Sequence, residues 1–126
     1  MTDEATTLYI EGIQAFGRGE HDLAVERYHA SLAVRPDDTE VLNALSMALM
    51  SLERFDEAVE IGSKVVELDP DDPMIHTSLS MIYQRMGKIE EAEAEAAKHR
   101  MKSWKQELKA NPNAPPPEDG DFKVIQ

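Results

Sequence analysis

One spacing repeats along this chain and limits its fold more than any other feature of the sequence. Arg35-Pro36-Asp37-Asp38 returns as Asp69-Pro70-Asp71-Asp72, so the same turn recurs with a step of 34. Repetition at a fixed step of about 20 to 50 residues is typical of architectures in which each unit packs only against its neighbours. Two further sets of positions keep the step: Ala24, Ala58 and Ala92, and the small residues Gly12, Ser46 and Ser80. The chain is therefore expected to be a stack of similar units.

The composition favours helices inside each unit. Aromatic residues make up only 6% of the chain, while Ala, Leu, Glu and Met are prominent, which favours helix over sheet. Proline cannot continue a helix, so Pro36 and Pro70 are expected to follow helix ends. Asp38 and Asp72 can then accept hydrogen bonds from the free amides that open the next helix. The sequence predicts an all-α chain.

The units also share an ordered pattern of large and small residues. The first unit has Tyr28 at the fourth position after its repeated alanine, where the next two units have Gly62 and Ala96. With the step of 34, this pattern resembles the tetratricopeptide-repeat family, whose motif is W-x2-L-G-x2-Y, A-x3-F, P. The chain departs from the motif at Glu11, which stands at the leucine position, and at Trp104, which stands where the third proline would be.

The resemblance implies three antiparallel helical hairpins, over residues 5–38, 39–72 and 73–106, stacked into a right-handed superhelix or α-solenoid. No proline follows Lys102-Ser103, so the last helix is expected to run from Ile89 to about residue 110, where Asn111-Pro112 ends it. This extended helix would cap the stack and complete a repeat domain over residues 1–110. Residues 111–126 form a tail rich in proline and acidic residues, with too little apolar surface to fold alone.

Charge and residue inventory exclude several classes of function. Thirteen Lys and Arg against twenty-five Asp and Glu give a net charge of −12, so the field of the chain repels nucleic-acid phosphates and anionic lipid. The sequence has no cysteine, no G-x-S-x-G motif and no Gly-rich phosphate loop, and its four histidines lack the spacing of a metal site. We therefore expect no enzyme, no cofactor, no metal ion and no nucleic-acid partner.

The N-terminus predicts a cytoplasmic protein that does not insert into membranes. It has no basic start followed by an apolar run, as a secretory signal would. No stretch approaches the roughly 18 consecutive apolar residues of a membrane-spanning helix.

In the tetratricopeptide-repeat family, the first helices of the hairpins build the inner wall of a curved groove. Transferring the wall positions to this chain implies a peptide-binding groove made of Tyr9, Ile13, Phe16, Asn43, Met47, Met50, Met74, Thr77, Met81, Gln84 and Arg85. This wall is unusually apolar, and methionine thioethers can repack around varied apolar partners. The alternative, that some of these methionines only fill gaps in the core, stays open at this point.

The wall lacks the charges of one branch of the family. Co-chaperones of that branch hold a C-terminal carboxylate with a clamp of Lys, Asn and Arg side chains. The corresponding positions here are Tyr9, Ile13, Ala44, Met74 and Ser78. Binding of a chaperone tail by such a clamp is therefore not expected.

A second candidate surface lies on the last predicted helix. Its residues are Lys98, Lys102, Trp104, Lys105 and Lys109. The lysines either form a solvated face that complements the negative end of the helix or dock an acidic partner. That partner could also be the acidic part of the tail, Glu118, Asp119 and Asp121.

Together these features predict a protein-protein interaction module, an adaptor or chaperone-like protein. It would bind an apolar peptide or helix of another protein in the concave groove. The alternative is a self-assembling structural protein that forms homo-oligomers through the last helix or the tail.

Overall fold

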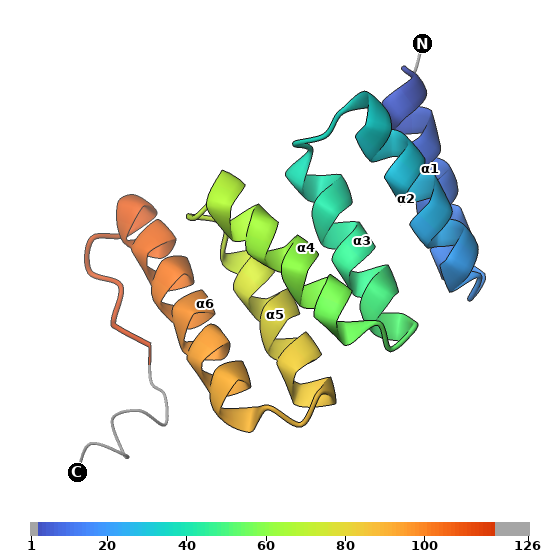
Figure 1. Cartoon of the computed structure of the whole chain (residues 1–126). Helices are drawn as coiled ribbons and strands as arrows, with labels where there is room; N and C mark the ends of the chain where they lie inside the picture. Colours follow the sequence, from blue (N-terminus) through green and yellow to red (C-terminus); the bar gives the residue numbers. More distant parts are fainter. Residues whose placement is uncertain (1–2, 118–126) are drawn as a thin grey trace. The chain divides into compact units, whose positions relative to one another are not determined.

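The computed structural model describes residues 3–117, which contain six α-helices and no strand. The helices are α1 (Glu4–Gly17), α2 (His21–Val34), α3 (Thr39–Ser51), α4 (Phe55–Leu68), α5 (Pro73–Arg85) and α6 (Ile89–Ala110). They pair in sequence into three antiparallel hairpins (Figure 1). The predicted all-α class and the extended last helix are confirmed. The chain divides into two compact units, Met1–Pro70 with α1 to α4 and Asp71–Gln126 with α5 and α6.

Capping aspartates and prolines set the ends of the helices as the sequence predicted. Asp38 Oδ1 accepts hydrogen bonds from the backbone amides of Glu40 at 3.1 Å and Val41 at 3.4 Å. Asp72 Oδ1 accepts one from the amide of Met74 at 2.9 Å. The helices α2 and α4 each end just before the residue that precedes a proline. Each proline-aspartate turn therefore ends one helix and starts the next.

The turn inside each hairpin contains one residue with a left-handed backbone. These residues are Gly19 (φ 80°), Glu53 (φ 61°) and Gly87 (φ 80°), which follow the repeat step. Glycine adopts this conformation without steric penalty, whereas a residue with a Cβ atom is disfavoured in it. The turn thus keeps its shape in the second hairpin although its residue type has changed.

Small residues bring the two helices of a hairpin close together. Ser46 Oγ donates a hydrogen bond to the backbone oxygen of Ala58 at 2.9 Å, and Ser80 Oγ donates one to that of Ala92 at 2.8 Å. All four residues are buried. The two bonds are equivalent by the repeat step, so α3 packs on α4 as α5 packs on α6.

In the first hairpin, Gly12 takes the position of these serines. The ring of Tyr28 lies over it so closely that a Cβ atom on Gly12 would stand 2.4 Å from Tyr28 Cε1. On the same pair of helices, Ser31 Oγ donates a hydrogen bond to the backbone oxygen of Ala5 at 2.8 Å. The helices α1 and α2 therefore meet through an aromatic ring set against a glycine.

The core of the first unit is centred on α3, which contacts both α2 and α4. Its fully buried side chains include Leu42, Leu45 and Leu49. In the second unit, Leu79 of α5 takes the position of Leu45 and is buried together with Ile75 and Ile82, where α5 packs on α6. None of the helices described over residues 3–117 has the length and apolar content needed to cross a membrane.

Two histidines join α5 to α6. The imidazole of His76 is buried, and its Nδ1 lies 2.8 Å from Glu95 Oε2. His99 Nδ1 donates a hydrogen bond to the backbone oxygen of Pro73 at 2.8 Å. Both side chains therefore hold the hairpin together.

The chain turns back along α6 after that helix ends (Figure 1). Trp104 Nε1 donates a hydrogen bond to the backbone oxygen of Ala114 at 3.0 Å, and Ala114 is only 6% exposed. Pro115 and Pro117 line a small pocket together with Trp104. The sequence predicted a tail with too little apolar surface to fold alone, but Ala114, Pro115 and Pro117 pack on the helix. The acidic residues Glu118, Asp119 and Asp121 lie outside the described part of the chain.

Replacing Gly12 with alanine should lower the free energy of unfolding by about 1 to 3 kcal/mol, because the new methyl group overlaps the Tyr28 ring. Gly17→Ala is the matched control, since a Cβ atom at Gly17 would meet nothing within 4 Å. Urea unfolding followed by circular dichroism measures both changes. Equal effects of the two substitutions would contradict the packing of Tyr28 on Gly12.

Ala114→Glu should release the tail segment from α6, because the substitution places a charge in a buried position. Trp104 is the single tryptophan of the chain, so its emission should shift to longer wavelength and become open to iodide quenching. Asn113→Glu puts the same charge on an exposed neighbour and should leave the emission unchanged. An unshifted spectrum for Ala114→Glu would contradict the docking of the tail.

Candidate peptide-binding faces

An apolar pocket of about 220 Å³ opens on the first unit, on the side where α1 and α3 adjoin. It is lined by Ile13, Phe16, Tyr28, Ala44 and Met47. Ile13 and Phe16 lie one helical turn apart on α1. The pocket thus gathers side chains from three helices of one unit.

Aromatic contacts fix the shape of this pocket. The rings of Tyr9 and Tyr28 are tilted by 45°, with centroids 6.0 Å apart. The Phe16 ring meets His21 edge to face, with centroids 4.8 Å apart. Because Tyr28 is also held against Gly12, the pocket wall is supported from behind and is formed in the free protein.

The phenol of Tyr9 is neutral under physiological conditions. Burial raises the pKa of Tyr9 above its usual 10.0, and the carboxylates of Glu40 and Asp38 raise it further. This end of the α1 face therefore combines a neutral ring with nearby negative charge, which disfavours an acidic guest there.

The six residues predicted for the first unit lie in different settings. Ile13, Phe16 and Met47 meet in the pocket, while Tyr9 and Asn43 are half-buried beside it. Met50 is only 8% exposed and packs in the core, so a guest could reach it only after its neighbours had moved. For Met50, the core interpretation that the sequence left open describes the observed position.

On the second unit, a pocket of about 330 Å³ opens at the equivalent position of the repeat. Its lining comprises Thr77, Ser80, Met81, Gln84, Ala96, His99 and Arg100. Three of the predicted residues, Thr77, Met81 and Gln84, are brought together here. Met74 and Arg85 are exposed on the same helix and do not line this pocket.

Residues of the second helices complete both pockets, and the wall prediction did not include them. Tyr28 and Ala96 occupy the same position of the repeat, in the first and third hairpins, and each lines its pocket. The sequence carried a usable signal, because Ala96 is a small residue where the family motif has an aromatic ring. A missing ring at a packing position leaves a hollow.

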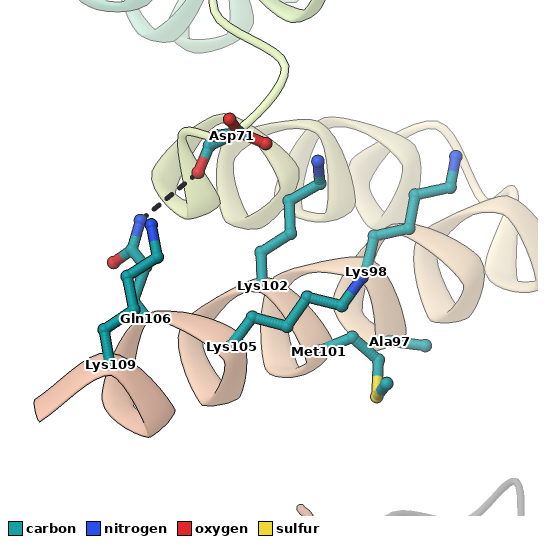
Figure 2. Close-up of a pocket in the computed structure, with 8 residues that line it drawn as sticks. All are labelled: Asp71, Ala97, Lys98, Met101, Lys102, Lys105, Gln106 and Lys109. Carbon is teal, nitrogen blue, oxygen red and sulfur yellow. Dashed lines mark hydrogen bonds between the residues drawn. The ribbon is translucent and has the colours of Figure 1, made fainter. Parts of the chain in front are cut away.

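The four lysines of the second candidate surface line one pocket, but Trp104 does not line it. A pocket of about 490 Å³ on the second unit is lined by Asp71, Ala97, Lys98, Met101, Lys102, Lys105, Gln106 and Lys109. Figure 2 shows Lys98 and Lys102 leaving α6 on the same side. Gln106 Nε2 donates a hydrogen bond to the backbone oxygen of Asp71 at 3.3 Å and closes one end. Trp104 instead faces the tail segment.

Known proteins match this arrangement of hairpins. A family model described as tetratricopeptide repeat matches residues 15–82, which is more than half of the 126 residues. The chain belongs to the tetratricopeptide-repeat family.

Among the residues that the structure describes, no group of three or more His, Cys, Asp or Glu side chains could hold a metal ion.

Two similar proteins are longer than this chain. Photosystem I assembly protein Ycf3 of Synechococcus sp. strain CC9605 is 29% identical over 91 residues, which are 70% of this chain and 53% of the relative. The chain thus spans about half the length of this curated relative. The structure of MamA from AMB-1 has a TM-score of 0.73 at 27% identity, covering 80% of this chain and 60% of MamA.

The type III secretion translocator chaperone SycD of Yersinia enterocolitica shares the fold at lower identity. Its TM-score is 0.77 at 17% identity, covering 87% of this chain and 84% of SycD. At this identity the likeness supports the fold only. All of these neighbours agree with a tetratricopeptide-repeat architecture.

The tyrosines of this tetratricopeptide-repeat chain should ionise only above the usual pKa of 10.0. Burial is the main cause of the raised pKa of Tyr9, Tyr28 and Tyr83, which are the three tyrosines of the chain. Above pH 10 the unfolded chain loses these protons first, so the free energy of unfolding should fall as pH rises further.

The ultraviolet absorbance of tyrosinate, followed from neutral to alkaline pH, measures this shift, and the unfolded protein in urea is the reference. A folded-state midpoint at or below that reference would contradict the burial of the three rings.

Proposed function

We propose that this chain is a protein-protein interaction module that binds an apolar segment of another protein on the first-helix faces of its hairpins. One observation carries the proposal. Ile13 and Met81 stand at the same position of the repeat, two steps apart, and are 45% and 44% exposed. Ile13 lines the pocket on the first unit, and Met81 lines the equivalent pocket on the second unit.

Scattered exposed apolar residues are common on proteins and need no explanation. Here, however, the exposed side chains recur at one register position and line concave surfaces, which is typical of binding sites. Filling such a hollow with an aliphatic side chain gains about 25 cal/mol per Å² of apolar surface removed from water. An apolar guest therefore has a physical reason to bind on both units.

The name of one relative supports a role of this kind. Ycf3 is named as an assembly protein, and this name refers to acting on other proteins. The absence of clamp charges at Tyr9, Ile13 and Met74 favours apolar side chains of the guest over a terminal carboxylate. We expect micromolar affinity, roughly −8 kcal/mol.

The double variant Ile13→Glu and Met81→Glu should lose binding of peptides selected from a random displayed library against the wild-type chain. The reason is that a carboxylate at either hollow would have to be desolvated by an apolar guest. Fluorescence polarisation with the selected peptides measures the dissociation constant, and we expect it to rise at least tenfold.

The matched control is Val34→Glu with Ile89→Glu. These two aliphatic residues are also exposed but lie on the second helices of their hairpins. This control should bind the selected peptides like the wild type, and circular dichroism should show equal helix content for all three proteins. If both double variants lost binding of the selected peptides equally, or if neither lost it, the assignment of the first-helix faces would be contradicted.

Self-association through the last helix is the competing proposal. Residues 114–117 of the same chain already cover Trp104, which reduces the apolar surface that a second copy could bury. Light scattering across concentration distinguishes the two. A dimer that persists in the Ile13→Glu and Met81→Glu variant and breaks in Trp104→Ala would favour self-association.

A further inference from the structure

We propose that the lysine face of α6, made of Lys98, Lys102, Lys105 and Lys109, binds a short acidic segment of a partner protein. An apolar side chain of that segment would rest on Ala97 and Met101, beside the lysines. This surface is separate from the first-helix faces proposed above, and the pockets at the two sites share no lining residue.

The lysine face borders a groove that has one charged side and one apolar side. The four lysines follow one another at intervals of 4, 3 and 4 along the sequence, which places them on one side of a helix. They line a pocket of about 490 Å³ together with Ala97 and Met101. Met101 is 40% exposed, so the groove offers an apolar edge next to the lysines.

The helix dipole does not account for these lysines. A cation stabilises the C-terminal end of a helix, but the effect falls off within the last turn. Of the four, only Lys109 lies in the last turn of α6. The other three would gain nothing from the dipole.

Neighbouring lysines on this face repel each other. Like charges three or four residues apart on a helix are destabilising, and the face contains three such pairs in succession. Lys98 Nζ lies 3.6 Å from Glu95 Oε1. For Lys105 and Lys109, the structure shows no ion pair with any residue between 3 and 117. An acidic segment would offset the charges of Lys105 and Lys109, which line the same pocket.

The net charge of the chain decides between kinds of anion. A nucleic acid or a membrane extends beyond the groove and would be repelled by the rest of a chain with a net charge of −12. A short peptide senses mainly the local field, because salt screens charges beyond about 8 Å. The apolar residues Ala97 and Met101 suit a side chain of a peptide, whereas a phosphate would gain nothing from contact with them.

The tail of the same chain follows another side of α6. Pro115 and Pro117 pack with His99, Ser103 and Trp104, and the tail pocket shares no residue with the lysine face. Residues 114–117 thus lie away from the lysines, which favours a segment from another protein.

The probe is a short fluorescein-labelled peptide in which glutamates flank two leucines, and its control has glutamines in place of the glutamates. The full chain should bind the acidic peptide and bind the glutamine peptide at least tenfold more weakly. The variant Lys105→Glu with Lys109→Glu should weaken binding of the acidic peptide about tenfold or more. Added salt should weaken binding to the wild type.

The matched control is Lys64→Glu with Lys88→Glu, which makes the same change in net charge at two exposed lysines elsewhere. It should retain most of the affinity. Equal affinity in both double variants would overturn the proposal, and so would equal binding of the two peptides. The Ile13→Glu and Met81→Glu variant should bind the acidic peptide normally, so the two binding proposals can fail independently.

Two further measurements test other occupants. Neutralising the tail through Glu118→Gln, Asp119→Asn and Asp121→Asn should leave the affinity for the acidic peptide unchanged. Tighter binding would mean that the tail itself competes for the groove, and it would overturn the proposal that a partner protein supplies the acidic segment. Binding of duplex DNA or phosphatidylserine vesicles with the same dependence on Lys105 and Lys109 would also overturn it.

Discussion

The close approach of the two helices in each hairpin is the constraint on which the rest of the structure depends. It needs a minimal side chain on the first helix and an alanine on the second, and the chain repeats this pairing at the same step in all three hairpins. Ser46 and Ser80 add a buried hydrogen bond to the carbonyl of the facing helix. Since a buried hydroxyl without a partner would be unfavourable, these bonds also fix the rotation of one helix against the other.

With that rotation fixed, each first helix has one side in the core and another in water. The leucines of α3 fill the core of the first unit, and Met47 stands at the edge of the pocket. The same division places Ile75 inside the second unit and Met81 in solvent. The candidate binding faces are thus a direct result of helix pairing.

Features set by local chemistry could be predicted from the sequence. Backbone hydrogen bonding accounts for the caps at Asp38 and Asp72. The proline ring, which cannot continue a helix, accounts for the helix ends before the prolines and for the end of α6 near residue 110. Features that depend on contacts between residues far apart in the sequence could not be predicted. The burial of Met50 and the return of Ala114 to Trp104 depend on which side chains meet after folding.

The pairing of Gly12 with Tyr28 has a consequence for how such a chain can change in evolution. A serine at that position suits the second and third hairpins, which carry Gly62 and Ala96 where the first has Tyr28, but in the first it would collide with the ring. The two positions are therefore bound to vary together, although they lie on different helices. Recombination that exchanges whole hairpins preserves both partners, whereas a crossover in the turn between α1 and α2 separates them.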